Sequence, residues 1–226
     1  MTGVTGCVFI IAGGPLGSPD FFRAQVSLFH PTELVCADGG ARHLETLGLA
    51  PQMIIGDLDS IPSATLEHFT AGGSRISRYP REKQKTDTQL ALEYAWQLFP
   101  REVRIYGGMG GRIDHTLANI SLLAAGVDKG VTTKLVDEWC EVSVITGRTT
   151  IEGKAGQTVS FFPFASPASG IDLEGFVYPL AGGRMEAGAP YGISNLLTAD
   201  RAGVSVAAGR LLMVKYHRQD FFPPDD

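Results

Sequence analysis

The sequence has few cysteines and no concentration of positive charge. Only three of its 226 residues are cysteine, an odd number with no C-x-x-C pair, which argues against a disulfide framework. Cys7 and Cys36 lie inside apolar runs, as buried reduced thiols of a cytosolic protein do. The formal net charge is −5 and no basic run occurs, which excludes a nucleic-acid footprint. Any anionic substrate must then be neutralised locally by arginine, lysine, backbone N–H groups or a metal ion.

Long hydrophobic segments are also missing. No apolar run is long enough to span a bilayer, which excludes a membrane-spanning protein with helical segments. The first apolar run, residues 8–12, has no positive segment before it, so it predicts a buried strand and not a signal peptide. We therefore expect a cytoplasmic protein without a membrane partner, long enough for one large domain or two modest ones.

Short apolar runs alternate with helical patterns from residue 7 to about residue 137. The apolar runs are 8–11, 34–37, 53–55, 103–106 and 134–136, and the helical patterns are 18–29, 40–47, 62–71, 87–98 and 113–125. Runs that are apolar on both faces and separated by helices indicate a doubly wound α/β fold with a mostly parallel sheet. Thr86 and Gln89 form the pattern of a capping box before helix 87–98. Gly126 is expected to end helix 113–125.

The pattern changes after about residue 146. Residues 159–161, 204–206 and 212–216 alternate with period two, and glycine and proline interrupt the sequence every few residues. This pattern predicts a smaller antiparallel β-sandwich or barrel. We therefore expect an α/β domain over 1–140 and a β-sandwich domain over 147–226, with 221–226 as a loose tail.

The first strand runs into a glycine-containing loop that resembles a dinucleotide-binding fingerprint. Gly14 and Gly17 fit its spacing, and Asp38 follows about 20 residues later, where an acid would hold a ribose. However, Ala12 stands where the tight-turn glycine belongs, and Pro15 removes a backbone N–H that would bind pyrophosphate. Both departures disfavour NAD binding, and a generic strand-to-helix turn explains the glycines equally well.

Two carboxylates, Asp57 and Asp59, follow directly on the expected strand 53–55. Ligand sites of open α/β sheets lie beyond the carboxyl ends of the strands. If the backbone stays extended, side chains at i and i+2 point the same way, and a divalent cation would relieve their repulsion. Oxygen ligands in small number suit Mg²⁺ shared with water and phosphate. The alternative is an ordinary turn in which Ser60 caps the next helix.

Asp87 supplies a third carboxylate at the expected start of a helix. An acid in the first turn is stabilised by the helix dipole alone. Lys83 and Lys85 lie just before it, with Thr86 between. These cations indicate either a place where phosphate and metal meet or a solvated charged loop, and the residues alone leave both interpretations open.

A second glycine-rich loop follows the expected strand 103–106. Residues 107–111 contain four glycines, whose backbone N–H groups can turn inward on an anion. Arg112 adds a fork suited to phosphate oxygens, and the helix that follows adds its dipole. The loop is no Walker loop, but it favours phosphate binding over a merely flexible turn. Asp114 is expected to orient or deprotonate a substrate hydroxyl, or to satisfy the helix start, whereas His115 is expected to be structural.

Several segments together resemble the thiamine pyrophosphokinase family. They cover nearly the whole chain in order: 37–41, 56–60, 86–92, 110–120, 159–163, 175–180 and 192–195. The resemblance implies transfer of diphosphate from ATP to the hydroxyl of thiamine, giving thiamine diphosphate and AMP. It also implies an α/β catalytic domain, a β-sandwich domain that binds thiamine, and a homodimer. The thiamine site of such dimers lies between the catalytic domain of one chain and the sandwich of the other.

The resemblance also implies roles for individual residues. The Mg²⁺ ligands would be Asp57, Asp59 and Asp87, and Arg112 and Asp114 would complete the catalytic set. The residues expected to bind ATP are Asp38, Gly39, Ser60, Lys83, Lys85, Thr86, Gly108, Gly110, Gly111 and Arg112. The residues expected to bind thiamine are Asp114, Tyr191, Ser194 and Asn195.

The chain departs from the family pattern at two places. The family often reads Lys-Asp-x-Thr-Asp, whereas this chain has Gln84 in place of the first acid. Trp96 and Trp139 are both expected outside the sandwich, so an aromatic partner for thiamine there would be Tyr191 or another Tyr or Phe.

Two rival functions are a diphosphokinase of the same fold acting on another alcohol, such as a hydroxymethylpterin, and a non-catalytic nucleotide sensor. Retention of the whole carboxylate set argues against the sensor.

Overall fold

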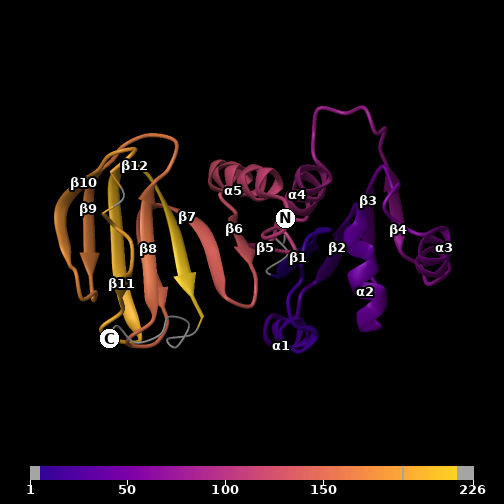
Figure 1. Cartoon of the computed structure of the whole chain (residues 1–226), viewed down its shortest axis with the longest axis horizontal. Coiled ribbons are helices and arrows are strands. Elements are labelled where there is room, and N and C mark those ends of the chain that lie inside the picture. The colour runs from indigo at the N-terminus through magenta and orange to yellow at the C-terminus, as the bar shows by residue number, and fades with distance from the viewer. Residues whose placement is uncertain (1–5, 190, 218–226) are drawn as a thin grey trace. The chain divides into compact units, whose positions relative to one another are not determined.

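The computed structural model describes residues 6–189 and 191–217, which form two compact units divided between Glu138 and Trp139 (Figure 1). Trp139 thus belongs to the second unit, so the expectation that both tryptophans lie outside it was wrong for this residue. Within the described ranges, no helix is both long and apolar enough to cross a membrane. The tail expected at 221–226 lies outside the described residues.

The first unit contains a parallel sheet in the order β6-β5-β1-β2-β3-β4. Its strands are β1 (Cys7–Ile11), β2 (Glu33–Ala37), β3 (Met53–Gly56), β4 (Arg75–Arg78), β5 (Glu102–Tyr106) and β6 (Thr132–Val136). Each apolar run of the first half lies inside one of these strands, which confirms the parallel sheet. The edge strand β4 was not predicted, because its four residues, two of them arginine, contain no apolar run.

Helices alternate with these strands as the sequence pattern predicted. They are α1 (Pro19–Phe29), α2 (Ala41–Leu47), α3 (Ser63–Ala71), α4 (Asp87–Gln97) and α5 (Ile113–Asp128), with a short 3₁₀ turn, η1 (Asp38–Gly40), before α2. The Thr86 hydroxyl accepts a hydrogen bond from the Gln89 N–H at 3.1 Å and so caps α4. The Gln89 side chain donates to Glu93 at 3.2 Å, so only half of the expected capping box forms.

Gly126 does not end α5, contrary to the prediction from sequence. The helix continues to Asp128, and Gly126 is buried inside its last turn. A Cβ at Gly126 would lie 2.3 Å from Oγ1 of Thr133 on β6. The glycine therefore serves the close approach of helix and strand, which the sequence pattern cannot distinguish from a helix stop.

The helices of the first unit cover both faces of its sheet. One face packs against α1, α2 and α3, where Phe22, Leu44 and Phe69 form a single core with strand residues such as Phe9 and Cys36. On the other face, α4 contacts β1, β2 and β3, and α5 contacts β6. Figure 1 shows α4 and α5 above the strands and α1 below them. Neighbouring strands β1 and β5 thus continue into helices on opposite faces, and a crevice is expected at their carboxyl ends.

The second unit is an antiparallel β-sandwich. Its strands are β7 (Cys140–Glu152), β8 (Thr158–Pro163), β9 (Ala168–Glu174), β10 (Leu180–Met185), β11 (Asn195–Leu196) and β12 (Arg201–Tyr216). The first part of β12 pairs with β9, its second part pairs with β8, and β7 follows it along both. Two sheets, β10-β9-β12-β7 and β11-β8-β12-β7, thus share their long strands and enclose one apolar core.

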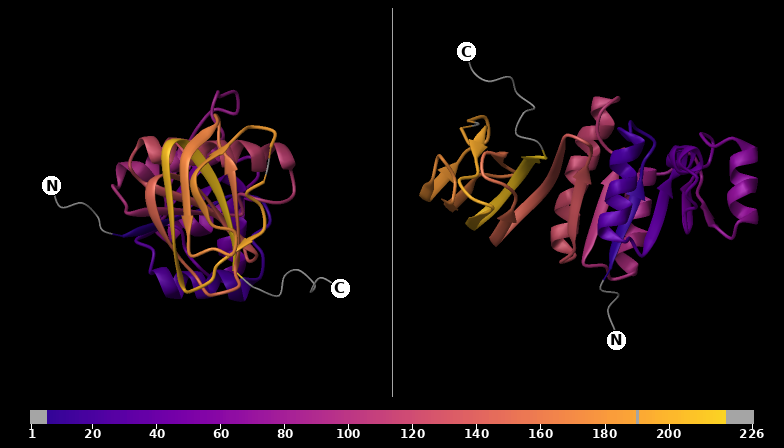
Figure 2. Two further views of the ribbon diagram at one scale, coloured as in Figure 1. Left: turned by 90° about the vertical axis from the view of Figure 1, so that its left-hand side faces the viewer. Right: turned by 90° about the horizontal axis from the view of Figure 1, so that it is seen from below.

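The runs expected at 204–206 and 212–216 belong to one strand, β12, and not to two. A register shift against β7 between Val206 and Leu211 separates them, so the alternation of buried side chains is interrupted there. The long curved course of β12 is drawn in yellow in Figure 2. The fold class predicted from the sequence, a doubly wound α/β sheet followed by a smaller antiparallel sandwich, is confirmed.

Candidate functional site

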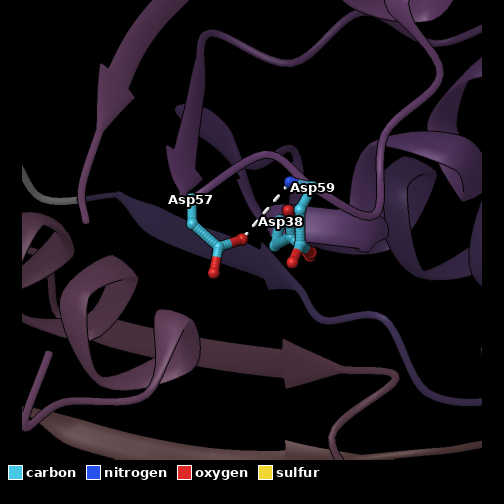
Figure 3. Close-up of side chains that lie close together, drawn as sticks. All are labelled: Asp38, Asp57 and Asp59. Carbon is cyan, nitrogen blue, oxygen red and sulfur yellow. Dashed lines mark hydrogen bonds between the residues drawn. The ribbon is translucent and has the colours of Figure 1, made fainter. Parts of the chain in front are cut away.

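Three carboxylates meet at the carboxyl ends of β2 and β3. Asp38 follows β2 directly, and Asp57 and Asp59 follow β3. Because β2 and β3 are parallel neighbours, their ends lie at the same edge, and the carboxylate oxygens of the three residues come within 4.8 Å of one another (Figure 3). Oδ1 of Asp38 is buried and has no hydrogen-bond partner among the described residues. A buried, unpartnered carboxylate oxygen beside two further carboxylates is a donor set that fits a hard divalent cation.

The two carboxylates after β3 approach each other through a turn. Leu58 between them has φ of 66°, so the backbone is not extended there and the condition set by the i, i+2 spacing is not met. A branched side chain in this region is strained, and burial of the Leu58 side chain in the core holds it there. The turn brings the Asp59 N–H to 3.3 Å from Oδ1 of Asp57, the contact dashed in Figure 3. Such strain is typical of a functional site.

Ser60 takes part in this turn and does not cap the following helix. Its hydroxyl donates to Oδ1 of Asp59 at 3.1 Å. Helix α3 begins at Ser63, with Pro62 in the capping position and no side-chain hydrogen bond there. The alternative that Ser60 belongs to an ordinary helix cap is therefore contradicted.

Asp87 lies at the first position of α4 and is joined to the acids by Lys83. The Lys83 Nζ is 3.0 Å from Oδ1 of Asp87 and 3.7 Å from Oδ2 of Asp57. Burial raises the pKa of Asp87, and the charges of Asp38 and Asp57 raise it further, against the opposing effect of Lys83. Burial acts in the same direction on Asp57, but the Asp59 N–H and Lys83 bring its pKa below the usual value. Asp87 thus adjoins the group of three without belonging to it.

The two other cations of the β4–α4 loop have different partners. Arg81 Nε lies 3.6 Å from Oδ2 of Asp59, and both side chains are largely exposed. Lys85 Nζ lies 2.7 Å from Oε2 of Glu93 on the outside of α4. Lys85 was expected to bind ATP. Its ammonium is instead paired with a carboxylate that is not one of the three acids at the strand ends.

A pocket of about 510 Å³ adjoins the acids within the first unit. Its lining includes nine of the residues expected from the sequence: Asp38, Gly39, Ser60, Thr86, Asp87, Gly108, Gly110, Gly111 and Arg112. It also includes residues that the sequence analysis did not select as site residues: Gly13, Gly14, Pro15, Arg42, Thr88, His115 and Asn119. These residues follow the ends of β1, β2, β3 and β5 or lie at the start or in the first half of α2, α4 and α5. The pocket therefore occupies the crevice expected where β1 and β5 diverge.

Two helix side chains hold the loops that line this pocket through hydrogen bonds to backbone carbonyls. Asn119 on α5 is buried and donates from Nδ2 to the Gly108 carbonyl at 2.8 Å. His43 on α2 donates from Nε2 to the Gly14 carbonyl at 2.8 Å, since a carbonyl only accepts. Burial lowers the pKa of His43, so its imidazole is neutral in this role. His43 carried no signal in the sequence, because its partner is a backbone atom of another loop. Asn119 lies in the family-like segment 110–120, but the sequence did not reveal its role.

The second glycine loop has the backbone freedom that was predicted for it. Gly107, Gly110 and Gly111 have φ of 65°, 77° and 65°, a region that favours glycine. At the end of the loop, Arg112 donates from Nε to Oδ1 of Asp114 at 3.1 Å. This hydrogen bond lowers the pKa of Asp114 to about 2, which makes its carboxylate a poor proton acceptor in this arrangement. Orientation of a neighbouring group is the more suitable role.

The remaining expected residues lie in the second unit. Tyr191 and Asn195 line a small pocket of about 130 Å³. Asn195 Oδ1 accepts from the N–H groups of Tyr178 at 3.0 Å and Leu196 at 2.9 Å, and its Nδ2 donates to the Tyr178 carbonyl at 2.8 Å.

Ser194 is exposed, with φ of 56°, and its N–H donates to Oγ of Ser160 at 3.0 Å. Asn195 is thus engaged with backbone, whereas Ser194 presents its side chain at the surface.

The contacts of Asn195 predict a structural effect of its removal. We expect Asn195→Ala to lower the free energy of unfolding by about 1–3 kcal/mol, because two N–H groups and one carbonyl lose their partner at a buried position. Urea unfolding followed by circular dichroism measures the change. Ser194→Ala at the next position should stay within about 0.5 kcal/mol of the wild type. Equal stability of both variants would contradict this role of Asn195.

Comparisons with known proteins decide the family. A model described as "Thiamin pyrophosphokinase, catalytic domain" matches residues 28–135, and one described as "Thiamin pyrophosphokinase, vitamin B1 binding domain" matches residues 148–211. Thiamine pyrophosphokinase from Bacillus subtilis is 32% identical to this chain, over 91% of this chain and 96% of that protein. This chain belongs to the thiamine pyrophosphokinase family.

Solved structures of thiamine pyrophosphokinases have the same fold. The crystal structure of the Bacillus subtilis protein superposes with a TM-score of 0.82 at 28% identity, over 93% of this chain and 98% of that one. The structure from Geobacillus thermodenitrificans gives a TM-score of 0.80 at 27% identity, over 96% and 100%. The similarity therefore extends over both units.

One departure from the thiamine pyrophosphokinase motif is now placed in the structure. Gln84, in the position of the missing acid, is exposed on the β4–α4 loop. Its neighbours Lys83 and Lys85 point to different carboxylates, the first to Asp57 and Asp87 and the second to Glu93. The loop therefore directs only one of its two lysines to the acids.

Proposed function

We propose that this chain is a thiamine diphosphokinase that transfers the diphosphate group of ATP to the hydroxyl of thiamine. The hydroxyl oxygen attacks the β-phosphorus of ATP and gives up its proton, the bond between this phosphorus and the bridging oxygen breaks, and AMP leaves with that oxygen. Family membership along both units supports the assignment of substrates. The observation that carries the chemistry is the group of carboxylates at the strand ends beside a glycine-lined pocket.

Mg²⁺ is the proposed metal, held by Asp57 and Asp59 together with Asp38 or Asp87. The carboxylate distances support Asp38 and the family motif supports Asp87, and each of the two has a buried carboxylate oxygen without a hydrogen-bond partner among the described residues. Bound there, the cation would neutralise charge on the phosphate oxygens, an effect of several kcal/mol in the transition state. The protein residues hold the metal and orient the two substrates, and little covalent chemistry is required of them.

The proposed ATP site is the pocket in the first unit. Its lining of glycines from two loops lets backbone N–H groups approach phosphate oxygens closely. Arg112 at the start of α5 adds a cation suited to the same oxygens. Asp114, held by Arg112, would orient the acceptor hydroxyl.

The proposed thiamine site uses Tyr191, Ser194 and Asn195 of the sandwich, in a homodimer whose partner chain contributes the catalytic domain. Large apolar side chains that lie exposed in each unit support a shared site. Tyr178, Tyr191 and Ile193 are 67%, 55% and 50% exposed in the sandwich, and Ile113 and Leu117 are 71% and 58% exposed beside Arg112. Exposed apolar patches of this kind mark binding surfaces.

The proposed location of the protein is the cytoplasm, where the environment is reducing. Cys7 and Cys36 are thiols, and burial raises the pKa of both, so neither is a reactive thiolate.

A single assay tests the function. The protein is incubated with ATP, Mg²⁺ and thiamine, and the products are separated by chromatography. AMP and thiamine diphosphate in equal amounts are expected. AMP formed only with a hydroxymethylpterin would instead identify the rival diphosphokinase, and binding of ATP without AMP from either acceptor would identify a sensor.

Ser194→Ala tests the acceptor pocket. We expect KM for thiamine to rise about 3–10-fold, the effect of one hydrogen bond of about 0.5–1.5 kcal/mol, with KM for ATP unchanged. Ser166→Ala, an exposed serine elsewhere in the sandwich, is the matched control. An equal rise in both KM values would argue against Ser194 as a thiamine residue.

A further inference from the structure

The loop between β4 and α4, residues 79–86, carries cationic side chains that form ion pairs with the acids of the candidate metal site. Arg81 reaches Asp59, and Lys83 reaches both Asp57 and Asp87. The two acids paired with Lys83 come from different elements, the turn after β3 and the first residue of α4. A single ammonium group therefore joins two elements of the site.

Lys83 differs from the other cations of this loop in its burial. Its side chain is 14% exposed, compared with 84% for Arg81 and 47% for Lys85. The ammonium also donates to the Pro80 carbonyl at 3.3 Å, in addition to its ion pairs with Asp87 and Asp57. Burial alone would lower the pKa of Lys83, but the hydrogen bond and charge of Asp87, together with Asp57, raise it above the usual value. The group is thus a largely enclosed cation, held by two carboxylates and one backbone carbonyl.

We propose that Lys83 is the resident cation of the acid site and competes with the divalent metal for Asp57. This inference rests on the proposed function only in taking these carboxylates as the metal site. A divalent cation bound at Asp57 and Asp59 would meet the Lys83 ammonium as a like charge, so the ammonium must leave Asp57 when the metal enters. The ammonium also contacts Asp87, which lines the nucleotide pocket.

The exchange has a consequence for the order of binding. Without a nucleotide, the displaced ammonium has lost one of its carboxylates, and this loss weakens binding of the metal. With ATP present, phosphate oxygens offer the ammonium a new partner. Lys83 thereby couples metal binding to nucleotide binding. It weakens binding of the metal to the protein when no ATP is bound.

Titration with Mn²⁺ in the absence of nucleotide tests the proposal. Free Mn²⁺ is followed by electron paramagnetic resonance, using the full chain as wild type, Lys83→Met and Lys83→Gln. Both variants should bind Mn²⁺ at least about tenfold more tightly than the wild type, because a like charge a few ångströms from the metal is removed. Lys85→Met is the matched control, with the same change of charge one residue away from Thr86. Its ammonium is paired with Glu93, so the affinity should stay within about twofold.

Thermal unfolding provides a second readout. Without metal, Lys83→Met should melt below the wild type, because Asp57 and Asp87 lose their shared cation, and saturating Mn²⁺ should raise its Tm more than that of the wild type. Unchanged or weaker Mn²⁺ affinity in the Lys83 variants would overturn the proposal. So would an equal gain in Lys85→Met, or a lack of Mn²⁺ binding in every protein at millimolar concentration. Failure of wild type to form thiamine diphosphate would remove the proposed substrate and leave the Mn²⁺ result valid.

Discussion

Replacing Asp57 or Asp59 by asparagine is expected to lower kcat/KM for thiamine diphosphate formation by about 10²–10⁴-fold. The metal contributes several kcal/mol of transition-state stabilisation, and a loss of about 1.4 kcal/mol corresponds to a factor of ten in rate. The fold should survive, because neither side chain belongs to an apolar core and Lys83 keeps its ion pair with Asp87 in both variants. Steady-state rates at saturating Mg²⁺ and thermal unfolding measure the two effects separately.

The matched control is Asp20→Asn, an exposed acid in the first turn of α1, which should leave the rate unchanged. Near-normal rates in both the Asp57 and the Asp59 variant would remove the metal assignment. Asp38→Asn and Asp87→Asn then distinguish the two possible third ligands. The ligand is the residue whose loss raises the Mg²⁺ concentration needed for half-maximal rate.

Gly40→Ala is expected to cause the largest loss of stability, about 3 kcal/mol or more. Gly40 opens α2, with an ordinary helical φ of −58°, so backbone strain is no obstacle to a side chain there. A Cβ would lie 2.0 Å from the Ile11 carbonyl oxygen and 2.6 Å from its carbon. These are backbone atoms of a central strand, and they cannot move without disturbing its hydrogen bonds to β2 and β5. Denaturant unfolding measures the loss.

Catalysis should also suffer in Gly40→Ala, because the end of β1 carries the Gly13–Gly14 loop of the pocket. Gly72→Ala is the control, since its φ is −76° and its nearest contacts are 3.4 Å away. That variant should stay within about 0.5 kcal/mol of the wild type. A Gly40→Ala protein of unchanged stability would show that α2 does not depend on this close approach.

The parts of the fold predicted from sequence are those with a local pattern. Continuous apolar runs identified the buried parallel strands, and each of the expected helices was found within a few residues of its predicted ends. The failures have non-local causes. Gly126 is a glycine because of Thr133 on another element, β4 is a short edge strand without an apolar run, and β12 continues through a register shift that interrupts its alternation.

The residues of the candidate site likewise divide into those with a local signal in the sequence and those placed by contacts between distant segments. Asp57, Asp59 and the second glycine loop stand at strand ends in the sequence and were found directly. Asp38 joins the acids only because β2 and β3 are neighbours in the sheet. The Gly13–Gly14 loop had been considered only for NAD, because the pairing of β1 with β5 that brings it to the second loop is not encoded near either one.

The shared strands of the sandwich determine how that unit can come apart. β7 and β12 each run through both sheets, so neither sheet possesses a complete set of strands of its own. Detaching one layer would break the strands on which the other is built. The unit is therefore expected to open as a single cooperative block, with amide protons on both layers exchanging together at its core. Its central pairing also joins segments some 60 residues apart, which delays assembly until both have been synthesised.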